Sequence, residues 1–336
     1  MRTRRRWNIH PLSNASLRKA AARLRRGELV AFPTETVYGL GANALDEKAV
    51  AKIFAAKGRP EDNPLIVHVA DRKMLRKVAR RLPALANRLI ARFWPGPLTI
   101  VLLKKSSVPS LVTAGLDTVA VRMPEGVARD LVRAAGVPVA APSANLSSRP
   151  SPTTARHVAE DFPDVFVLDG GPTKHGVEST ILAMDPEPRI LRHGAISAEL
   201  LRKVIGDSPS LSKKPPGPGP RSSRSGSSPP AESPGTKYRH YAPTRPLILF
   251  RRIAALRAYS RAHPKALVIC PARFVPLFPK QTVLSLGSSQ EEMARRLFAA
   301  LRTRRRGSEL LILAVPRRGL GRTIMDRLER AATRIV

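Results

Sequence analysis

Apolar and polar positions alternate along residues 28–192 in two distinct rhythms. Short apolar runs, of the kind that form buried strands, stand at residues 28–32, 64–70, 98–103, 118–123, 137–141, 166–169, 179–184 and 189–192. Between some of them, residues 46–57 and 129–136 place apolar side chains every three or four positions, which is the period of a helix. Strands that alternate in part with helices predict an α/β sheet with helices packed on it.

The last part of the chain repeats this rhythm on a smaller scale. Apolar runs at residues 246–250, 265–270, 281–286 and 309–315 alternate with helical patterns at residues 253–263, 289–303 and 323–333. This order predicts a second, smaller parallel α/β domain of the Rossmann-like type. Residues 207–235 are rich in Pro, Gly and Ser and too poor in apolar residues to fold. We therefore expect a first domain at residues 1–206, a linker at 207–245 and a second domain at 246–336.

Composition is typical of a globular protein from a reducing compartment. The 336 residues are 43% hydrophobic, which is ample for a packed core. The single cysteine, Cys270, excludes a disulfide within the chain and argues against a cysteine-built zinc site. No apolar segment follows the arginine-rich start, and the longest apolar run, LLILAV, is far too short to span a bilayer. We expect a cytoplasmic protein with no membrane partner.

The formal charge of +34 raises the question of nucleic acid. Residues 1–206 hold 33 Lys and Arg against 18 Asp and Glu, residues 207–236 hold 4 against 2, and residues 237–336 hold 22 against 5. Basic residues within residues 71–82 recur around apolar ones at helical spacing, as on a solvated helix face. Aromatic residues make up 4% of the chain and are not interleaved with the arginines. This favours general surface charge with weak, non-specific RNA contact over a sequence-reading groove.

Two cations follow the helical pattern at residues 46–57. Lys57 stands at its end and Arg59 in the turn formed with Gly58 and Pro60. Cations two residues apart can converge on one polyanion, as phosphate binding requires. Alternatively, both complement the negative end of the helix dipole. No G-x-x-x-x-G-K-[ST] sequence is present, so a P-loop is not expected.

Polar residues also fall within and after predicted strands. His68 shares a strand face with Ile66, and Thr118 and Arg122 share a face with Ala120. An arginine in such a strand needs an anion, which either a protein carboxylate or a ligand carboxylate can supply. Further polar groups follow or begin strands, where open α/β sheets bind ligands: Ser143, Asn145, Ser147, Ser151, Glu178, Ser179 and Thr180.

Six segments together resemble one known family. FPTETVYGLGANA, KGRPEDNPLIVHV, PGPLTIVL, VAVRMP, APSANLSS and VESTI followed by RHG are similar, in order and spacing, to the YrdC-domain family. SPGTKYRHYAP, followed by a second domain that ends in GLGRTIMDRLERAA, resembles the two-domain branch of that family, the threonylcarbamoyl-AMP synthases. The resemblance covers residues 12–336 apart from the Pro/Ser-rich part of the linker. It implies a twisted, open, mixed sheet for the first domain.

The resemblance also implies an activity and its residues. The expected reaction joins L-threonine, bicarbonate or CO2, and ATP into L-threonylcarbamoyl-AMP and releases pyrophosphate, a nucleotidyl transfer. The product serves the threonylcarbamoyl modification of adenosine 37 in tRNA, through a downstream transferase machinery. By family position the threonine side holds Thr36, His68, Arg122, Ala141 and Ser179. The ATP side holds Lys57, Arg59, Asn63, Thr118, Ser143, Asn145, Ser151, Arg192 and Tyr238.

The implied chemistry needs no protein nucleophile. The carbamate of threonine attacks the α-phosphorus, and Lys57 and Arg59 are expected to be catalytic because they neutralise the developing charge. Mg²⁺ is expected to arrive with ATP, without a dedicated protein site. Related carbamoyl transferases of hydrogenase maturation carry cysteine-rich zinc fingers, which one cysteine excludes here. A non-enzymatic RNA-binding module is the alternative reading of the charge.

The segment KYRHYAP, residues 237–243, ends the linker with aromatic and basic residues. A passive tether needs neither, because Gly, Ser and Pro suffice. The segment either anchors the second domain or folds as a lid over the cleft of the first, excluding water while the adenylate forms. We hypothesise the lid.

Overall fold

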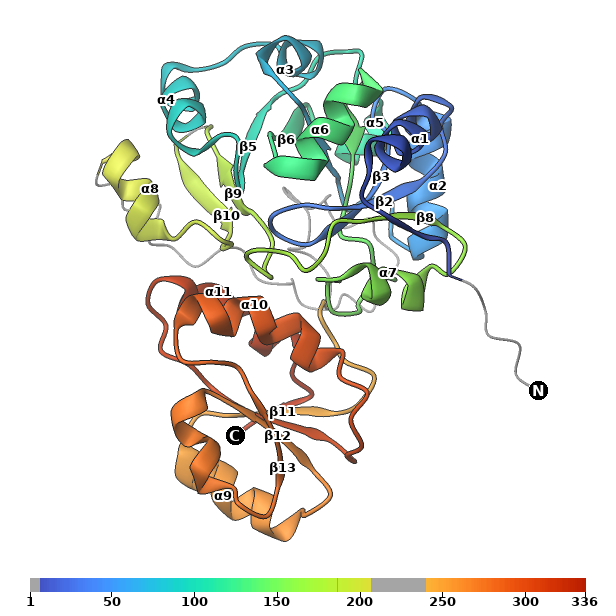
Figure 1. Ribbon diagram of the computed structural model, residues 1–336. Helices are drawn as coiled ribbons and strands as arrows, with labels where there is room; N and C mark the ends of the chain where they lie inside the picture. Colours follow the sequence, from blue (N-terminus) through green and yellow to red (C-terminus); the bar gives the residue numbers. More distant parts are fainter. Residues whose placement is uncertain (1–6, 186, 207–239) are drawn as a thin grey trace, which may run out of the picture.

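Two α/β domains in contact form this protein, seen in a computed structural model that describes residues 7–185, 187–206 and 240–336 (Figure 1). The first domain is built on a ten-stranded sheet and the second on a five-stranded sheet. Both the mixed α/β fold of the first domain and the smaller parallel domain were predicted, and both are confirmed. Most of the predicted linker, including Tyr238, lies outside the described residues.

The large sheet has the strand order β1-β8-β2-β3-β7-β4-β6-β5-β9-β10. Its neighbours are partly parallel, as in β4–β6 and β5–β9, and partly antiparallel, as in β2–β3 and β5–β6. The strands are β1 (Ile9–Pro11), β2 (Val30–Pro33), β3 (Tyr38–Asn43), β4 (Ile66–His68), β5 (Leu98–Leu103), β6 (Thr118–Arg122), β7 (Val139–Ala140), β8 (Phe166–Asp169), β9 (Thr180–Ala183) and β10 (Arg189–Arg192).

Helices pack on both sides of this sheet (Figure 1). They are α1 (Asn14–Arg25), α2 (Glu47–Lys57), α3 (Arg72–Val78), α4 (Ala84–Phe93), α5 (Ser110–Thr113), α6 (Gly126–Ala135), α7 (Ala155–Asp161) and α8 (Ala198–Ile205). Helix α7 packs against Ala31 and Val167 on one side, and the larger core on the other side includes α1, α2 and α6. Helix α2 begins after Asp46, whose side chain accepts the Ala49 N–H at 3.1 Å, and ends at Gly58, where φ is +57°. Glycine tolerates this left-handed turn, which leads directly to Arg59.

Strand β3 was not predicted from the sequence, because glycine is disfavoured in strands. The structure explains the choice of Gly41. A Cβ atom there would lie 2.6 Å from the ring of Phe32 and 2.8 Å from Val139. The ring of Phe32 therefore occupies the space that a side chain at position 41 would need. The polar stretch at residues 32–44 forms the end of one strand, a turn and a second strand.

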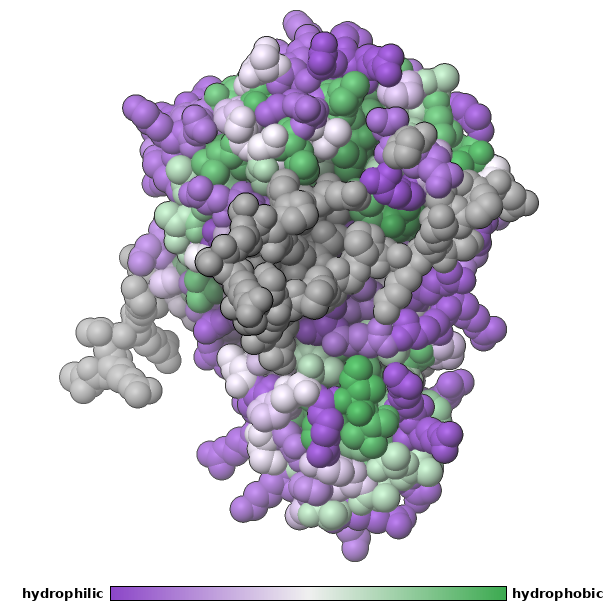
Figure 2. Space-filling model, turned by 180° about the vertical axis from the view of Figure 1, so that it is seen from behind, coloured by the Kyte–Doolittle hydropathy of each residue, from purple (hydrophilic) through white to green (hydrophobic). Residues whose placement is uncertain are grey.

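The basic helix predicted at residues 71–82 is shorter than expected. Helix α3 ends at Val78, because Ala79 forms a β-bridge with Lys104. The predicted basic residues are nevertheless exposed, as a solvated face requires. Figure 2 agrees, since hydrophilic side chains cover much of the visible coloured surface of both domains.

The second domain has the strand order β13-β12-β14-β11-β15, and every neighbouring pair is parallel. Helices α10 and α11 lie on the side that faces the first domain, and α9 lies on the opposite side (Figure 1). The elements are β11 (Leu247–Phe250), α9 (Ile253–Ala262), β12 (Leu267–Cys270), the 3₁₀ helix η2 (Ala272–Leu277), β13 (Thr282–Ser285), α10 (Gln290–Leu301), β14 (Leu310–Leu313), α11 (Leu320–Ala331) and β15 (Arg334–Ile335).

Apolar side chains join the two domains. Val37 and Val177 of the first domain belong to the same buried cluster as Leu297 of α10 and Ile324 of α11. Such burial is the main force that holds domains together. Within the described ranges, no helix is both long enough and apolar enough to cross a membrane.

Candidate active site

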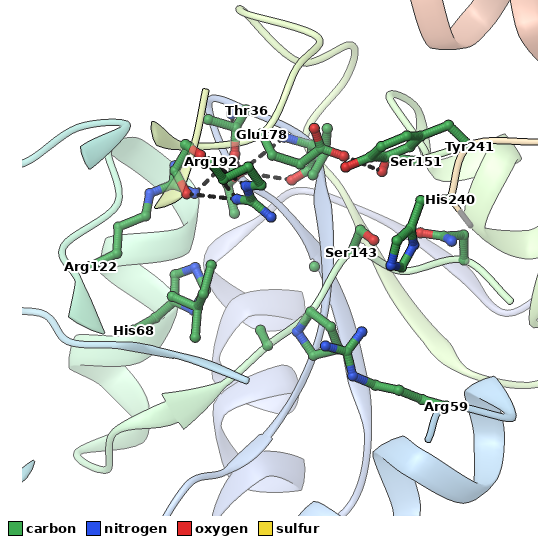
Figure 3. A pocket seen from close by; sticks show the side chains of 18 of the residues that line it. Thr36, Arg59, His68, Arg122, Ser143, Ser151, Glu178, Arg192, His240 and Tyr241 are labelled. Carbon is green, nitrogen blue, oxygen red and sulfur yellow. Dashed lines mark hydrogen bonds between the residues drawn. The ribbon is translucent and has the colours of Figure 1, made fainter. Parts of the chain in front are cut away.

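A cavity lies where strand ends and loops of the first domain meet, and residues just before β11 close one side of it (Figure 3). The β2–β3 turn, the ends of β4 and β6, the loop after β7 and the entry to β9 supply its other walls. The predicted residues that line it are Thr36, Arg59, His68, Arg122, Ala141, Ser143, Asn145, Ser151, Ser179 and Arg192. Folding thus brings together most of the predicted site, from residues far apart in the sequence.

Arg122, at the end of β6, is held by the protein itself. Its Nη2 lies 2.6 Å from Oε1 of Glu35, its Nη1 donates to Oγ1 of Thr36 at 2.9 Å, and its Nε donates to the Gly96 carbonyl at 3.2 Å. Both charged side chains are 4% exposed. Of the two partners that the sequence left open for this arginine, a protein carboxylate is present, and Glu35 is a site residue to which sequence reasoning gave no role.

The β2–β3 turn is built by Thr34. Its hydroxyl oxygen accepts the backbone N–H groups of Thr36 and Val37, at 3.1 and 3.2 Å. The same oxygen lies 2.7 Å from the hydroxyl of Thr36. Threonine and serine commonly stabilise turns in this way. The turn aims Thr36 at Arg122 and into the cavity.

His68 ends β4 and is buried beside Arg122, its partner in the parallel β4–β6 register. Burial, with a smaller effect of the Arg122 charge, lowers the pKa of His68 from 6.5 to about 3. The imidazole is therefore neutral near pH 7. Its Nδ1 has no hydrogen-bond partner among the described residues, so one polar atom beside the cavity is available to a ligand.

Lys57 and Arg59 are both fixed by backbone carbonyls. The Lys57 ammonium donates to the carbonyls of Ser143, at 2.5 Å, and Asn145. Burial, and secondly the charge of Arg59, hold the pKa of Lys57 well below its usual value. Arg59 donates to the carbonyls of Asn63 at 3.0 Å and Pro64 at 2.8 Å. Arg59 lines the cavity, whereas Lys57 supports the Ser143–Asn145 loop from behind.

A carboxylate holds the serine of the opposite wall. Ser151 donates to Oε1 of Glu178 at 2.7 Å, and Oε2 of Glu178 accepts from Nε of Arg327 at 2.9 Å. Arg327 belongs to α11 of the second domain and is fully buried. It also donates to the His193 carbonyl at 2.8 Å, and its guanidinium lies 5.1 Å from the ring centre of Tyr241. The second domain therefore reaches the wall of the cavity through one arginine.

Arg192 and Ser179 form the third side. Arg192 Nη2 donates to the Ser179 carbonyl at 3.0 Å and hydroxyl at 3.2 Å, and the same hydroxyl lies 2.7 Å from that of Thr99. Burial lowers the pKa of Arg192, although Tyr241 and Glu178 oppose this. The guanidinium stays charged, because the usual pKa of arginine is far above 7.

Three of the predicted site residues that the structure describes do not line the cavity. Lys57 and Asn63 lie behind it and position Ser143, Asn145 and Arg59. Thr118 begins β6, about 13 Å from Arg122 at some 3.3 Å per residue, and lines a separate cavity with Leu103 and Arg189. Tyr238 lies outside the described residues.

Other residues of the site had weak sequence signals. His240 and Tyr241, from the predicted lid segment, line the cavity, and the Tyr241 ring stacks on Phe298 at 5.2 Å (Figure 3). This contact also anchors residues 240–243 to the second domain, and the lid stays a prediction because residues 237–239 lie outside the described residues. Arg149 lines the cavity too, and it was overlooked because an arginine in a Ser-rich loop reads as surface charge.

The acids near the cavity do not form a metal centre. No group of three or more His, Cys, Asp or Glu side chains suitable for a metal occurs among residues 7–185, 187–206 and 240–336. Glu35 and Glu178 are each paired with an arginine. The cavity is instead rich in cationic and hydroxyl groups, which suit anionic substrates.

Comparisons with known proteins agree with this geometry. The Sua5/YciO/YrdC family model, described as telomere recombination, matches residues 22–194, and the model of the threonylcarbamoyl-AMP synthase C-terminal domain matches residues 196–333. Threonylcarbamoyl-AMP synthase of Pyrococcus abyssi is 45% identical over 333 residues, 94% of each chain. That of Bacillus subtilis is 44% identical over 337 residues, 95% of this chain and 94% of its own.

A solved structure and a shorter relative complete the comparison. The crystal structure of P. abyssi Sua5 complexed with L-threonine has a TM-score of 0.85 at 43% identity and covers 98% of this chain and 97% of that one. A threonylcarbamoyl-AMP synthase of Halorhodospira halophila is 43% identical over 145 residues, 43% of this chain and 74% of its own. The present chain belongs to the threonylcarbamoyl-AMP synthase family, in its two-domain form.

Proposed function

We propose that this chain joins L-threonine, bicarbonate or CO2, and ATP into L-threonylcarbamoyl-AMP, and so acts as a nucleotidyltransferase. The observation that carries the proposal is one shared cavity, which is lined both by expected threonine residues and by expected ATP residues. The former are Thr36, His68, Arg122, Ala141 and Ser179, and the latter are Arg59, Ser143, Asn145, Ser151 and Arg192. An amino acid and a triphosphate can therefore meet there. The likeness to a protein crystallised with L-threonine supports the same reading.

Arg122 can bind the threonine carboxylate without releasing Glu35. A guanidinium has five N–H donors, and three of them are engaged by Glu35, Thr36 and Gly96. The two that remain can pair with one carboxylate. Because His68 is neutral, it does not repel the substrate amine. Thr36 and Ser179 then offer hydroxyl groups to the polar atoms of the amino acid.

On the ATP side, the chain orients the reactants and supplies charge. The threonine amine adds to CO2 with loss of a proton, and an oxygen of the carbamate attacks the α-phosphorus. The bond from that phosphorus to the bridging oxygen breaks, and pyrophosphate leaves. Arg59 and Arg192 neutralise charge on the phosphates, and Lys57 holds the Ser143–Asn145 loop. Tyr238 is a further expected ATP contact, whereas Thr118, which lines a separate cavity, has no part in this scheme.

Mg²⁺ enters this scheme with ATP. The carboxylates Glu35 and Glu178 are already paired with arginines, so the metal would be held by phosphate oxygens of ATP, as Mg²⁺ at nucleotide sites often is. Its contribution is to neutralise negative charge on the triphosphate. The product passes to the transferase machinery that modifies adenosine 37 of tRNA in the cytoplasm.

One assay tests the proposal against the alternative of an RNA-binding module without activity. Release of pyrophosphate from ATP is measured with threonine and bicarbonate both present, and with each omitted. We expect release only when both are present, together with a product of the mass of threonylcarbamoyl-AMP. Release that ignores either co-substrate, or no release while the protein still binds RNA, would refute the proposal.

A further inference from the structure

A second cavity, of about 560 Å³, lies at the contact between the two domains. It is bordered by the end of α7, by the chain that leads into β11 and by the α10–β14 connection. Six arginines line it, Arg149, Arg245, Arg302, Arg304, Arg305 and Arg306, against two carboxylates, Glu160 and Asp161. A concave site with this excess of positive charge concentrates anions.

Residues 302–307, here named the arginine loop, are held in place by hydrogen bonds from Arg245 and to Asp161. The guanidinium of Arg245 donates to the carbonyls of Thr303 at 2.7 Å, Arg305 at 2.6 Å and Gly307 at 3.1 Å. Arg302 anchors the start of the loop by donating to Oδ2 of Asp161 at 2.6 Å. A loop whose backbone is fixed in this way loses little further backbone entropy when a ligand binds.

Two of those side chains have no charge partner among the described residues. Arg304 pairs with Glu160 at 3.2 Å, but Arg305 and Arg306 make no ion pair with any residue that the structure describes, and both are exposed. Each guanidinium carries five N–H donors in a planar fork that matches phosphate oxygens. The loop therefore supplies phosphate-binding groups beside a cavity.

Arg149 connects this cavity to the candidate active site, because it lines both. Its Nη1 lies 2.8 Å from Oδ1 of Asp161, and its side chain is 43% exposed. The backbone carbonyl of the neighbouring Ser148 accepts a hydrogen bond from the Ala242 N–H at 2.8 Å, which joins the loop that carries Arg149 to the chain before β11. An anion that leaves the active site past Arg149 would meet the arginine loop.

From this arrangement we infer that the second cavity binds a condensed phosphate, and that its ligand during turnover is the departing pyrophosphate. The inference rests on the proposed function, which generates pyrophosphate in the adjoining cavity. RNA phosphates share this chemistry, but none of the described residues that line the second cavity is aromatic, so they offer no surface on which bases could stack. A volume of this size also suits a small ligand.

Binding can be measured with pyrophosphate as the probe. Full-length Arg305→Ser/Arg306→Ser is compared with wild type by calorimetric titration. The control, Arg251→Ser/Arg252→Ser, removes the same charge from an adjacent, exposed pair between β11 and α9 that lines neither cavity. We expect the loop variant to raise the pyrophosphate Kd by about tenfold or more, and the control by less than about twofold, because charge-assisted hydrogen bonds act locally.

The same two variants distinguish a phosphate site from general charge attraction and from an RNA surface. Equal weakening of pyrophosphate binding in both variants would mean general charge attraction and would overturn the inference. Loss of affinity for a single-stranded RNA 12-mer in the loop variant, with pyrophosphate binding unchanged, would replace the phosphate site by an RNA surface. The pyrophosphate-release assay on wild type tests the proposed function separately. If release fails while the loop variant still loses pyrophosphate affinity, the reaction is wrong and the phosphate site stands.

Discussion

Arg122 is fixed by Glu35, Thr36 and Gly96 before a substrate binds. Such preorganisation places the remaining N–H donors without further ordering of the side chain. It also makes the residue part of the fold, since removing one member of a buried ion pair typically costs roughly 3–5 kcal/mol. A substitution that keeps the charge is therefore more informative than truncation.

Arg122→Lys is expected to weaken the use of threonine far more than that of ATP. Lysine retains a cation for Glu35 but loses the planar fork that can hold a second carboxylate. Steady-state kinetics should show the KM for threonine raised by about tenfold or more and the KM for ATP changed by less than about twofold. Equal changes for both substrates would contradict the assignment, and Glu35→Gln measures how much of any effect comes from the ion pair.

His68 gives the stability of the protein a defined pH dependence. Its pKa is about 3 in the folded protein and about 6.5 when unfolded. Between these values the unfolded chain binds more protons, so the free energy of unfolding falls as pH falls. The Tm of His68→Gln minus the Tm of wild type should therefore increase as pH is lowered from 7 to 4, because the variant lacks this titrating group. A difference in Tm that is constant over this range would show that His68 is not buried in its neutral form.

Arg59 and Lys57 should differ on substitution although they were predicted as a pair. Arg59 lines the cavity, so Arg59→Ala should lower kcat by about a hundredfold, and it should lower Tm less than Lys57→Ala because Arg59 is only partly buried. Lys57→Ala should lower Tm as well, because the carbonyls of Ser143 and Asn145 lose their buried donor. Arg76→Ala, on the exposed face of α3, serves as control. A near-normal kcat in Arg59→Ala would contradict the proposed role of Arg59 in neutralising phosphate charge.

At the scale of the element, apolar rhythm predicted most strands because burial sets their pattern. Strand β3 was not predicted, because it contains Gly41, which leaves room for the ring of Phe32 from the neighbouring strand. The length of α3 was not predicted either, because a β-bridge between Ala79 and Lys104 ends the helix. Site residues at strand ends were predicted through the family resemblance. Glu35 and Arg149 were not, because their partners come from other elements.

Arg327 of helix α11 forms an ion pair with Glu178 of the first domain, a contact that the sequence pattern of the helix alone does not show. Arg327→Met should destabilise the protein by roughly 3–5 kcal/mol, because Glu178 would remain buried without its partner. It should also raise the KM for ATP, because Ser151 loses the carboxylate geometry that holds it. Chemical denaturation and steady-state kinetics measure the two effects.

Two further variants decide how Arg327 acts. Arg327→Met/Glu178→Gln should recover most of the lost stability, because no unpaired charge remains, but should leave the KM for ATP high. Thr323→Val removes another contact of α11 with the first domain, a hydrogen bond to the Gly194 carbonyl of 2.9 Å, and should cost only about 1 kcal/mol with no change in KM. A double variant with normal KM would reduce Arg327 to a structural role.

For the whole molecule, the sequence gives the net charge but does not show which basic side chains form buried ion pairs. The second domain directs Arg302 to Asp161 and Arg327 to Glu178, and so converts part of its basic excess into buried pairs with the first domain. Contacts between residues more than 140 positions apart leave no local pattern in one sequence. The division of the chain into domains remains a prediction from composition, and α8, at the end of the first, packs into that domain's core through Leu201.

The second domain should therefore be needed for full activity of the first. A chain that ends at Gly206 keeps the ten-stranded sheet but exposes Val37 and Val177 and leaves Asp161 and Glu178 without Arg302 and Arg327. We expect a lower Tm and synthesis of threonylcarbamoyl-AMP reduced by about tenfold or more, since small displacements of positioning groups are costly.

Adding Glu178→Gln to the shortened chain distinguishes stability from positioning. This change removes the buried charge that Arg327 paired, and Asp161 keeps its ion pair with Arg149. Tm should therefore recover in part, whereas synthesis should stay low, because nothing replaces the arginine that sets the Ser151 wall. The Halorhodospira halophila relative, of which 145 matching residues are already 74%, is shorter than this chain, so enzymes with this name exist without a comparable second domain. If the shortened chain works at the full-length rate, the second domain of this protein does not shape the active site either.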